Sequence, residues 1–409
     1  MRVGEGRSGG SHEGAFGRLW RSRAATCGDY TARMVTTAPA ELLGPLLADI
    51  AAREAADPER YPVETVAQLI AARLHAAPFA PVHGGLGWSL REAVGAVELL
   101  SEASPSAGLL LAMPMGLAGV HAIDVDVAPV EHRARWAMAM EALAKEYAAG
   151  RWYAACNSEK GAGGSLDATK TVARLDARGR FCLSGEKILA SGGTFADVFF
   201  STAKVSQEDL PGAGVVEFFF LPVKGEGTSV LADWDGFGMR STESHTVRYE
   251  SAPAAGLMGF PNFIATVQPL SYWFCLFAAI PLGCAAGILR TLGTPAPTSP
   301  ALRLRLSDAV MRYESLRAYL LETATGWRAA GGPALAARVL RTKTFVTSEA
   351  TKLCAELFSL AGGRHYRSRD PLARALSASF AGTALRPPLA LALDTLVDQF
   401  SLGELQPGP

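Results

Sequence analysis

The stretch YAACNSEKGAGGSLDATKTVA, residues 153–173, lies where the sequence changes from a helical pattern to short strand-like segments. It places glycine, alanine and hydroxyl side chains between two short segments rich in aromatic and β-branched residues. Small side chains let a backbone approach a flat ligand closely, and Ser158 and Ser165 offer hydroxyls that can bond to ring heteroatoms or a carbonyl. A glycine-rich hairpin loop without a ligand fits the stretch equally well.

Short strand-like segments continue to about residue 249 and are typical of antiparallel strands. They are rich in β-branched and aromatic residues, and Gly and Asp clusters separate them. The predicted strands lie in WYAACNS, KTVARLD, FCLSGEKILAS, DVFFSTAKV, VVEFFFLPV and HTVRYES.

The segments on either side of these strands have a helical pattern. Leu42, Leu46 and Ile50 recur at three- and four-residue spacing, and residues 63–74, 90–101 and 130–149 repeat this pattern. Turns are predicted at HGGLGW, residues 83–88, and at SPSAG, residues 104–108. After residue 255 the sequence predicts helices at 304–330, 334–360 and 372–399.

The predicted fold class is therefore α+β, with an N-terminal helical domain, a central antiparallel β-domain and a C-terminal helical bundle. The boundaries that we predict are 36–150, 151–253 and 254–409. Residues 1–35 are Arg-, Gly- and Ser-rich without an apolar segment, which predicts a disordered tail, with a transit peptide as the alternative and Met34 as a candidate start.

Composition excludes several classes of function. Lys plus Arg equal Asp plus Glu at 39 each, so no net field favours nucleic acid as a partner. The six cysteines have no CxxC spacing, which argues against a metal site and fits a reducing, cytoplasmic location.

One apolar stretch, SYWFCLFAAIPLGCAAGIL at residues 271–289, is long enough to span a membrane. Pro281 lies inside it, and no aromatic belt with flanking positive charge frames both ends. We therefore predict no membrane span but a central helix of the bundle, surrounded on all sides.

Three motifs in this order resemble the acyl-CoA dehydrogenase family. Ser158-Glu159 and the following GAGGSLD resemble the family's Thr/Ser-Glu and Gly-x-Gly-Ser-Asp signature with one or two extra residues. Gly185-Glu186-Lys187 with Ser191-Gly192-Gly193 resembles its Gly-Glu-Lys strand, and GMRST at residues 238–242 resembles its Gly-x-Arg-x-Thr/Ser turn. The resemblance runs from about residue 36 to the C-terminus.

The resemblance implies a bound FAD between the β-domain and the second helical domain, an acyl thioester substrate, an electron acceptor and a homodimer or homotetramer. It also implies that Ser158 and Ser191 face the flavin ring and that AGGRHY, residues 361–366, receives cofactor pyrophosphate from a neighbouring subunit. The residues that it assigns to the cofactor are Cys156, Ser158, Ser191, Gly192, Gly362 and Gly363. It places Ser165 at the substrate or cofactor phosphate region, and we add Trp273 as a substrate contact because of its apolar surroundings.

The chain departs from the family at two places. The glutamate that serves as general base is missing from both of its usual positions, the helix start at residues 271–274 and the loop ARALSASFAGTALRPP at residues 373–388. The Arg-x-x-Phe-Gly segment that contacts FAD across the dimer is replaced by LRTLGTPAPTSP, residues 289–300. The catalytic residues are therefore not assigned.

Three functions remain open at this stage; the first is our main prediction and the other two are its alternatives. The first is an FAD-dependent oxidoreductase acting on the CH–CH group of an acyl thioester, with Glu356, Asp370 or Asp394 as a substitute base. The second is a monooxygenase that uses reduced flavin as a co-substrate and oxygen, for which no base is needed and an apolar wall at Trp273 is suitable. The third is a homologue without catalytic activity.

Three histidines complete the candidates. His83 lies on a turn before a helix, which favours a structural role. His245 lies in a polar strand and could be structural or catalytic. His365 lies where the resemblance places cofactor phosphate, and we expect an exposed loop residue.

Overall fold

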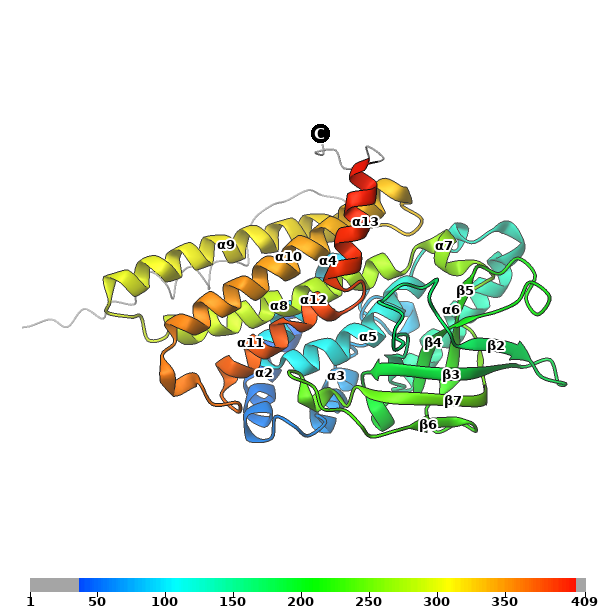
Figure 1. Cartoon of the computed structure of the whole chain (residues 1–409), viewed down its shortest axis with the longest axis horizontal. Coiled ribbons are helices and arrows are strands. Elements are labelled where there is room, and N and C mark those ends of the chain that lie inside the picture. The colour runs from blue at the N-terminus through cyan, green and yellow to red at the C-terminus, as the bar shows by residue number, and fades with distance from the viewer. Residues whose placement is uncertain (1–36, 402–409) are drawn as a thin grey trace, which may run out of the picture.

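The computed structural model describes residues 37–401. Figure 1 shows a sheet on one side and the long helices α8, α9 and α10 on the other, with helix α5 between them. This arrangement confirms the predicted order of helices, strands and helices. The predicted tail at 1–35 lies outside the described residues, and the division into separate domains stays a prediction.

Two of the N-terminal helices, α4 and α5, begin at recognisable capping residues. Ser89 and Glu92 form a capping box at the start of α4, and Ser104 accepts a hydrogen bond from the Ala107 amide at the start of α5. The predicted turn at 104–108 is therefore wrong, because Ser-Pro is also a helix start signal. The helices are α2 Pro39–Ala56, α3 Val63–Ala71, α4 Leu90–Ala103, α5 Pro105–His121 and α6 Arg133–Ala148.

The strands form one curled sheet in the order β6-β7-β3-β2-β4-β5-β8, with β1 paired to β4. Most pairs are antiparallel as predicted, but β1 and β2 each pair with β4 in parallel, so the sheet is mixed. The very short β6 and β8 were not predicted. The strands are β1 Tyr153–Ala155, β2 Val172–Leu175, β3 Phe181–Ala190, β4 Val198–Lys204, β5 Val216–Pro222, β6 Thr228–Val230, β7 His245–Pro253 and β8 Gly256–Leu257.

The C-terminal region is a bundle in which the predicted helix 372–399 is interrupted. Pro387 and Pro388 lack the amide hydrogens that a continuous helix needs, so a loop separates α12 from α13. The helices are α7 Phe263–Val267, α8 Leu270–Gly293, α9 Pro300–Thr325, α10 Gly332–Leu360, α11 Pro371–Ser379, α12 Ala381–Ala384 and α13 Leu389–Ser401.

Helix α8 is the central helix of this bundle, as predicted. It is long and apolar enough to cross a membrane, but 89% of its most apolar window is buried inside the protein. Glycines allow its close contacts: a Cβ on Gly116 of α5 would lie 2.1 Å from the Trp273 indole nitrogen, and one on Gly283 would lie 2.3 Å from the Glu98 carbonyl of α4. The side chains at the start of α8 can therefore reach the space between the bundle and the sheet.

Candidate functional site

A cleft of about 300 Å³ lies between the sheet and the helices. One wall includes Ala155, Asn157, Ser158, Leu189, Ser191 and part of the loop 234–244. The opposite wall comes from α5, the start of α8 and residues 377–386. Because most of its lining is apolar or aromatic, the cleft suits a flat organic ring.

The helical wall is an aromatic face of α8. Leu270, Trp273, Phe274 and Phe277 line the cleft, and their spacing places them on one face of the helix. The indole of Trp273 donates to the Met113 carbonyl over 3.3 Å and stacks on Phe200, with ring centroids 5.4 Å apart. These contacts fix the ring of Trp273 as a rigid part of the wall.

The sheet wall carries a chain of three hydroxyls that the structure buries at the cleft. Ser191 Oγ lies 2.9 Å from Ser244 Oγ, which lies 2.7 Å from Thr242 Oγ1. Thr242 in turn donates to the Met239 carbonyl over 2.9 Å. Ser191 was predicted as a flavin contact; Thr242 belongs to the third motif, and Ser244 had no signal in the sequence.

Ser158 lines the same wall, and a buried ion pair holds the loop that follows it. Lys187 Nζ lies 2.6 Å from the Glu159 carboxylate, which also accepts hydrogen bonds from the Lys170 and Thr171 amides and the Thr171 hydroxyl. Burial raises the pKa of Glu159, but the hydrogen bond and charge of Lys187, together with hydrogen bonds from the Thr171 hydroxyl and the Lys170 amide, hold that pKa below its ordinary value. Glu159 of the first motif and Lys187 of the second therefore hold the backbone next to Ser158 in place.

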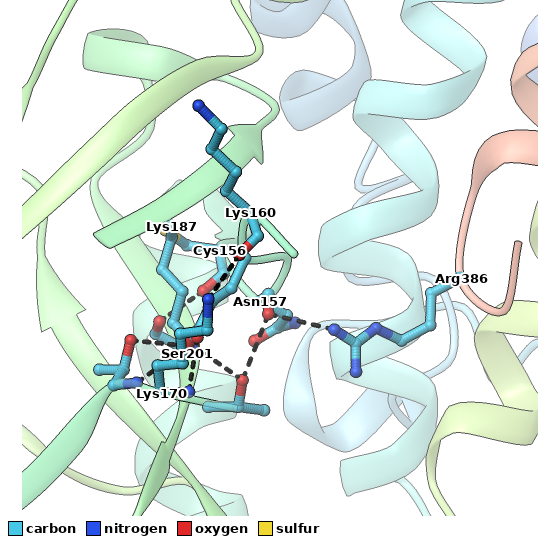
Figure 2. Close-up of polar contacts among 10 residues, drawn as sticks. Cys156, Asn157, Lys160, Lys170, Lys187, Ser201 and Arg386 are labelled. Atoms are coloured by element: carbon cyan, nitrogen blue, oxygen red, sulfur yellow. Dashed lines mark hydrogen bonds and ion pairs between the residues drawn. The ribbon is translucent and has the colours of Figure 1, made fainter. Parts of the chain in front are cut away.

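Arg386 is a cation in this otherwise uncharged lining. Figure 2 shows its guanidinium reaching Asn157, whose carbonyl accepts from Nη2 over 3.1 Å. Arg386 Nη1 and Asn157 Oδ1 are buried without a hydrogen-bond partner within the described residues. Buried polar atoms normally have a hydrogen-bond partner, so the unpaired Arg386 Nη1 and Asn157 Oδ1 indicate that the polar edge of a ligand binds between them. Neither residue was a sequence candidate.

The acidic candidates for the missing base lie elsewhere. Glu356 is exposed and pairs with Arg312, and Asp394 is exposed on α13. Asp370 caps α11 by accepting from the Leu372 amide. Among the described residues that line the cleft there is no aspartate, glutamate or histidine.

The histidine candidates also lie outside the cleft. His83 is exposed, whereas His245 is held between the Trp234 amide and the Glu243 carboxylate, which fits a structural role. The expectation of an exposed His365 is wrong: its ring is buried, and its Nδ1 lies 3.1 Å from both carboxylate oxygens of Asp370.

Several predicted site residues do not line the cleft. Cys156 points into the sheet interior, where burial raises the pKa of its thiol to about 11 and makes it unreactive. Gly192 makes a turn with φ of 100° and donates its amide to the Thr242 carbonyl. Ser165 is half-buried in the loop after Ser158. Their roles stay predictions.

Gly362 and Gly363 are exposed after the end of α10. This end of the bundle lies away from the sheet in Figure 1. A cofactor contact from these glycines would therefore be made to another subunit, as the resemblance implies, and it stays a prediction.

The cleft fits an isoalloxazine ring. Such a ring is flat and apolar on its faces, and it carries carbonyls and ring nitrogens on one edge. The apolar walls match the faces, while Ser158, Ser191 and the orphaned atoms of Asn157 and Arg386 offer donors and acceptors for the edge.

Comparison with known protein families identifies two domains. The acyl-CoA dehydrogenase middle domain matches residues 154–252, and the acyl-CoA dehydrogenase C-terminal domain matches residues 279–377. The first matched region contains the residues of the sheet wall, whereas the second reaches the cleft only at Ser377.

A curated relative shares about half of its length with the chain. L-evernosamine nitrososynthase of a Micromonospora species is 32% identical over 222 residues, which are 52% of this chain and 49% of that protein.

Solved structures share the fold along most of the chain. KijD3 in complex with FMN and dTDP-3-amino-2,3,6-trideoxy-4-keto-3-methyl-D-glucose has a TM-score of 0.78 at 20% identity, covering 92% of this chain and 97% of that one. Dibenzothiophene monooxygenase TdsC from a Paenibacillus species has a TM-score of 0.71 at 20% identity, covering 91% and 97%. Butyryl-CoA dehydrogenase from Megasphaera elsdenii has a TM-score of 0.75 at 18% identity, covering 91% and 100%. Likeness at these identities shows the fold alone.

Proposed function

This chain belongs to the acyl-CoA dehydrogenase superfamily of flavin-dependent enzymes, and we propose that it is a monooxygenase that uses reduced flavin and oxygen. The observation that carries the proposal is the lining of the cleft. It contains flavin-compatible polar groups, yet no carboxylate among its described residues. An acyl thioester dehydrogenase needs a base within reach of the substrate α-proton, whereas oxygen transfer has no such requirement.

Bound flavin would supply the redox chemistry: reduced flavin gives two electrons to oxygen, one oxygen atom enters the substrate and the other leaves as water. The protein would contribute orientation and exclusion of water. Ser158, Ser191 and Asn157 would hold the ring edge, and the α8 face at Trp273 would pack against the ring or substrate.

Two features support a flavin held as a co-substrate. Helix α8 ends at Gly293 and α9 begins at Pro300, so a short Pro-rich loop stands where the family has its FAD-contacting segment. FMN, which lacks the adenylate, would need no such segment. KijD3, which shares the fold, is described in complex with FMN.

The apolar lining favours a substrate whose reacting part is an uncharged ring, with a nitrogen, sulfur or aromatic carbon that accepts the oxygen. The curated relative is a nitrososynthase, which supports nitrogen, and the structural neighbour TdsC is a dibenzothiophene monooxygenase, which supports sulfur. We also infer a homo-oligomer from the family resemblance, which light scattering of the purified protein would test.

The experiment mixes the protein with anaerobically reduced FMN and then with ¹⁸O₂ in the presence of indole, dibenzothiophene or an amino sugar nucleotide. Mass spectrometry should find one ¹⁸O atom in a product. A parallel sample of protein with oxidised FAD receives butyryl-CoA without oxygen. Bleaching of the flavin there, without ¹⁸O incorporation in the first assay, would overturn the proposal in favour of a dehydrogenase.

A further inference from the structure

We propose that Arg386 and Ser191 make the cleft selective for the reduced, negatively charged form of flavin over the oxidised, neutral form. This inference rests on the proposed function and assigns its cofactor selectivity to two named side chains. Two observations support it: Arg386 Nη1 has no hydrogen-bond partner, and the hydroxyl chain from Ser191 through Ser244 to Thr242 has one direction.

The charge of Arg386 has no counter-charge in the cleft. No acid lines the cleft within residues 37–401, and Glu159, the acid that most affects Arg386, is already paired with Lys187. Burial lowers the pKa of Arg386, but an arginine keeps its charge in proteins. A buried N–H donor without an acceptor is unfavourable, so an anionic ligand edge would gain both a hydrogen bond and a charge interaction there.

The backbone around Arg386 is held in place. The buried ammonium group of Lys343 donates to the Leu385 carbonyl over 2.9 Å and to the Pro387 carbonyl over 2.6 Å, on either side of Arg386. The guanidinium is also anchored on the Asn157 carbonyl of the sheet wall. Arg386 is therefore preorganised, and little entropy is lost when a ligand binds to it.

The hydroxyl chain has only one consistent direction. Three hydroxyls share three contacts, and the last acceptor, the Met239 carbonyl, has no proton to give. For all three contacts to be hydrogen bonds, Ser191 must donate to Ser244, Ser244 to Thr242 and Thr242 to Met239. Ser191 then offers only lone pairs to the cleft, where it acts as an acceptor.

The two forms of flavin differ at the atoms that such groups would recognise. The oxidised ring is neutral and carries a lone pair at N5, whereas the reduced ring carries N5–H and a negative charge shared by N1 and the C2 carbonyl. In the orientation that we propose, Ser191 faces N5 and Arg386 faces N1 and the C2 carbonyl, so that the acceptor hydroxyl and the unpaired cation both match the reduced ring. With the oxidised ring, the Ser191 lone pair would face the lone pair of N5, and the charge of Arg386 would meet no negative charge.

The test compares dissociation constants for dithionite-reduced and oxidised FMN, measured anaerobically by fluorescence and ultrafiltration. We expect Arg386→Gln to weaken binding of reduced FMN by roughly 10- to 100-fold, as for a hydrogen bond to a charged group, and to change oxidised FMN by no more than about twofold. Arg386→Lys keeps the charge and should retain part of the selectivity. Equal losses for both forms, or none, would overturn the inference.

A second pair of variants keeps the test independent of Arg386. Thr242→Val removes the last hydroxyl of the chain, which allows Ser244 and Ser191 to reverse and donate into the cleft, so selectivity for reduced FMN should fall. Thr242→Ser preserves the chain and should leave selectivity unchanged. Selectivity that is the same in both variants would contradict the role given to Ser191.

The outcomes separate the inference from the proposed function. A wild-type protein that binds neither form of FMN nor FAD would contradict the proposed function itself. Normal selectivity in Arg386→Gln, together with weaker binding of a phosphorylated substrate, would show that Arg386 recognises a substrate anion and would overturn this inference alone.

Discussion

The two walls of the cleft are built on different principles. The sheet wall carries most of the polar side chains of the cleft and is held by a buried ion pair, a directed hydroxyl chain and backbone hydrogen bonds. The helical wall is mostly apolar, with Arg386 as its charged residue, and its α8 face is held by aromatic packing and by a close contact with a glycine. The sheet wall is therefore suited to fixing the edge of a cofactor, and the helical wall to accepting substrates of different shapes.

Removing the ion pair should have the largest effect on the sheet wall. Lys187→Met leaves Glu159 buried without its partner, and we expect the free energy of unfolding to fall by about 3–5 kcal/mol. Urea denaturation followed by circular dichroism measures this. As a control, the double variant Lys187→Met/Glu159→Gln should recover part of the loss. A loss below about 1 kcal/mol would mean that the pair does not hold the wall.

The same pair predicts a pH dependence. Because Lys187 holds the pKa of Glu159 below its ordinary value of 4.5, the carboxylate contributes stability that is fully present above pH 4.5 and is lost as the pH falls through the lower folded-state pKa. The difference in stability between wild type and the double variant should therefore shrink in acid. A difference that stays constant from pH 6 to pH 3 would contradict the direction of this shift.

The helical wall is tested by Gly116→Ala. The added methyl would overlap the Trp273 indole, so we expect overpacking to lower the free energy of unfolding by about 1–3 kcal/mol and to displace the ring in the cleft. Calorimetry measures the first effect and tryptophan fluorescence the second. The matched control is Gly95→Ala in α4, where a Cβ meets nothing within 4 Å, so that variant should gain stability, by about 0.5–1 kcal/mol.

The hydroxyl chain should contribute less to stability than to binding. Ser244→Ala breaks the chain in its middle, and the net loss should be about 1 kcal/mol of unfolding free energy. Thermal unfolding measures this loss. A much larger loss would mean that the three hydroxyls hold the sheet wall together and do not only line it.

The difference between the walls also explains what the sequence could predict. The aromatic stretch around Trp273 and the glycine-rich loop after Ser158 are local patterns. The first lines the cleft, whereas only Ser158, before the second, does so. The order of helices and strands followed from periodicity in the same way. Ser158 was named from its glycine-rich surroundings, and Ser191 through the family resemblance.

The remaining site residues depend on tertiary contacts. Arg386 meets Asn157 across 229 positions of sequence, and no local pattern in Leu-Arg-Pro-Pro distinguishes a cleft arginine from a surface one. Likewise, Ser104-Pro105 is compatible with a turn or a helix start, and only the packing of α5 against α8 decides between them.

The smallest effect is expected at Glu356, the exposed acid that the sequence offered as a substitute base. Its carboxylate pairs with Arg312 on the bundle surface and does not line the cleft, so Glu356→Gln should cost at most about 1 kcal/mol of stability. It should also leave flavin oxidation and product formation unchanged, as should Asp394→Asn. A loss of more than tenfold in turnover from either variant, with flavin binding intact, would place a catalytic acid outside the cleft described here and would revive the dehydrogenase function.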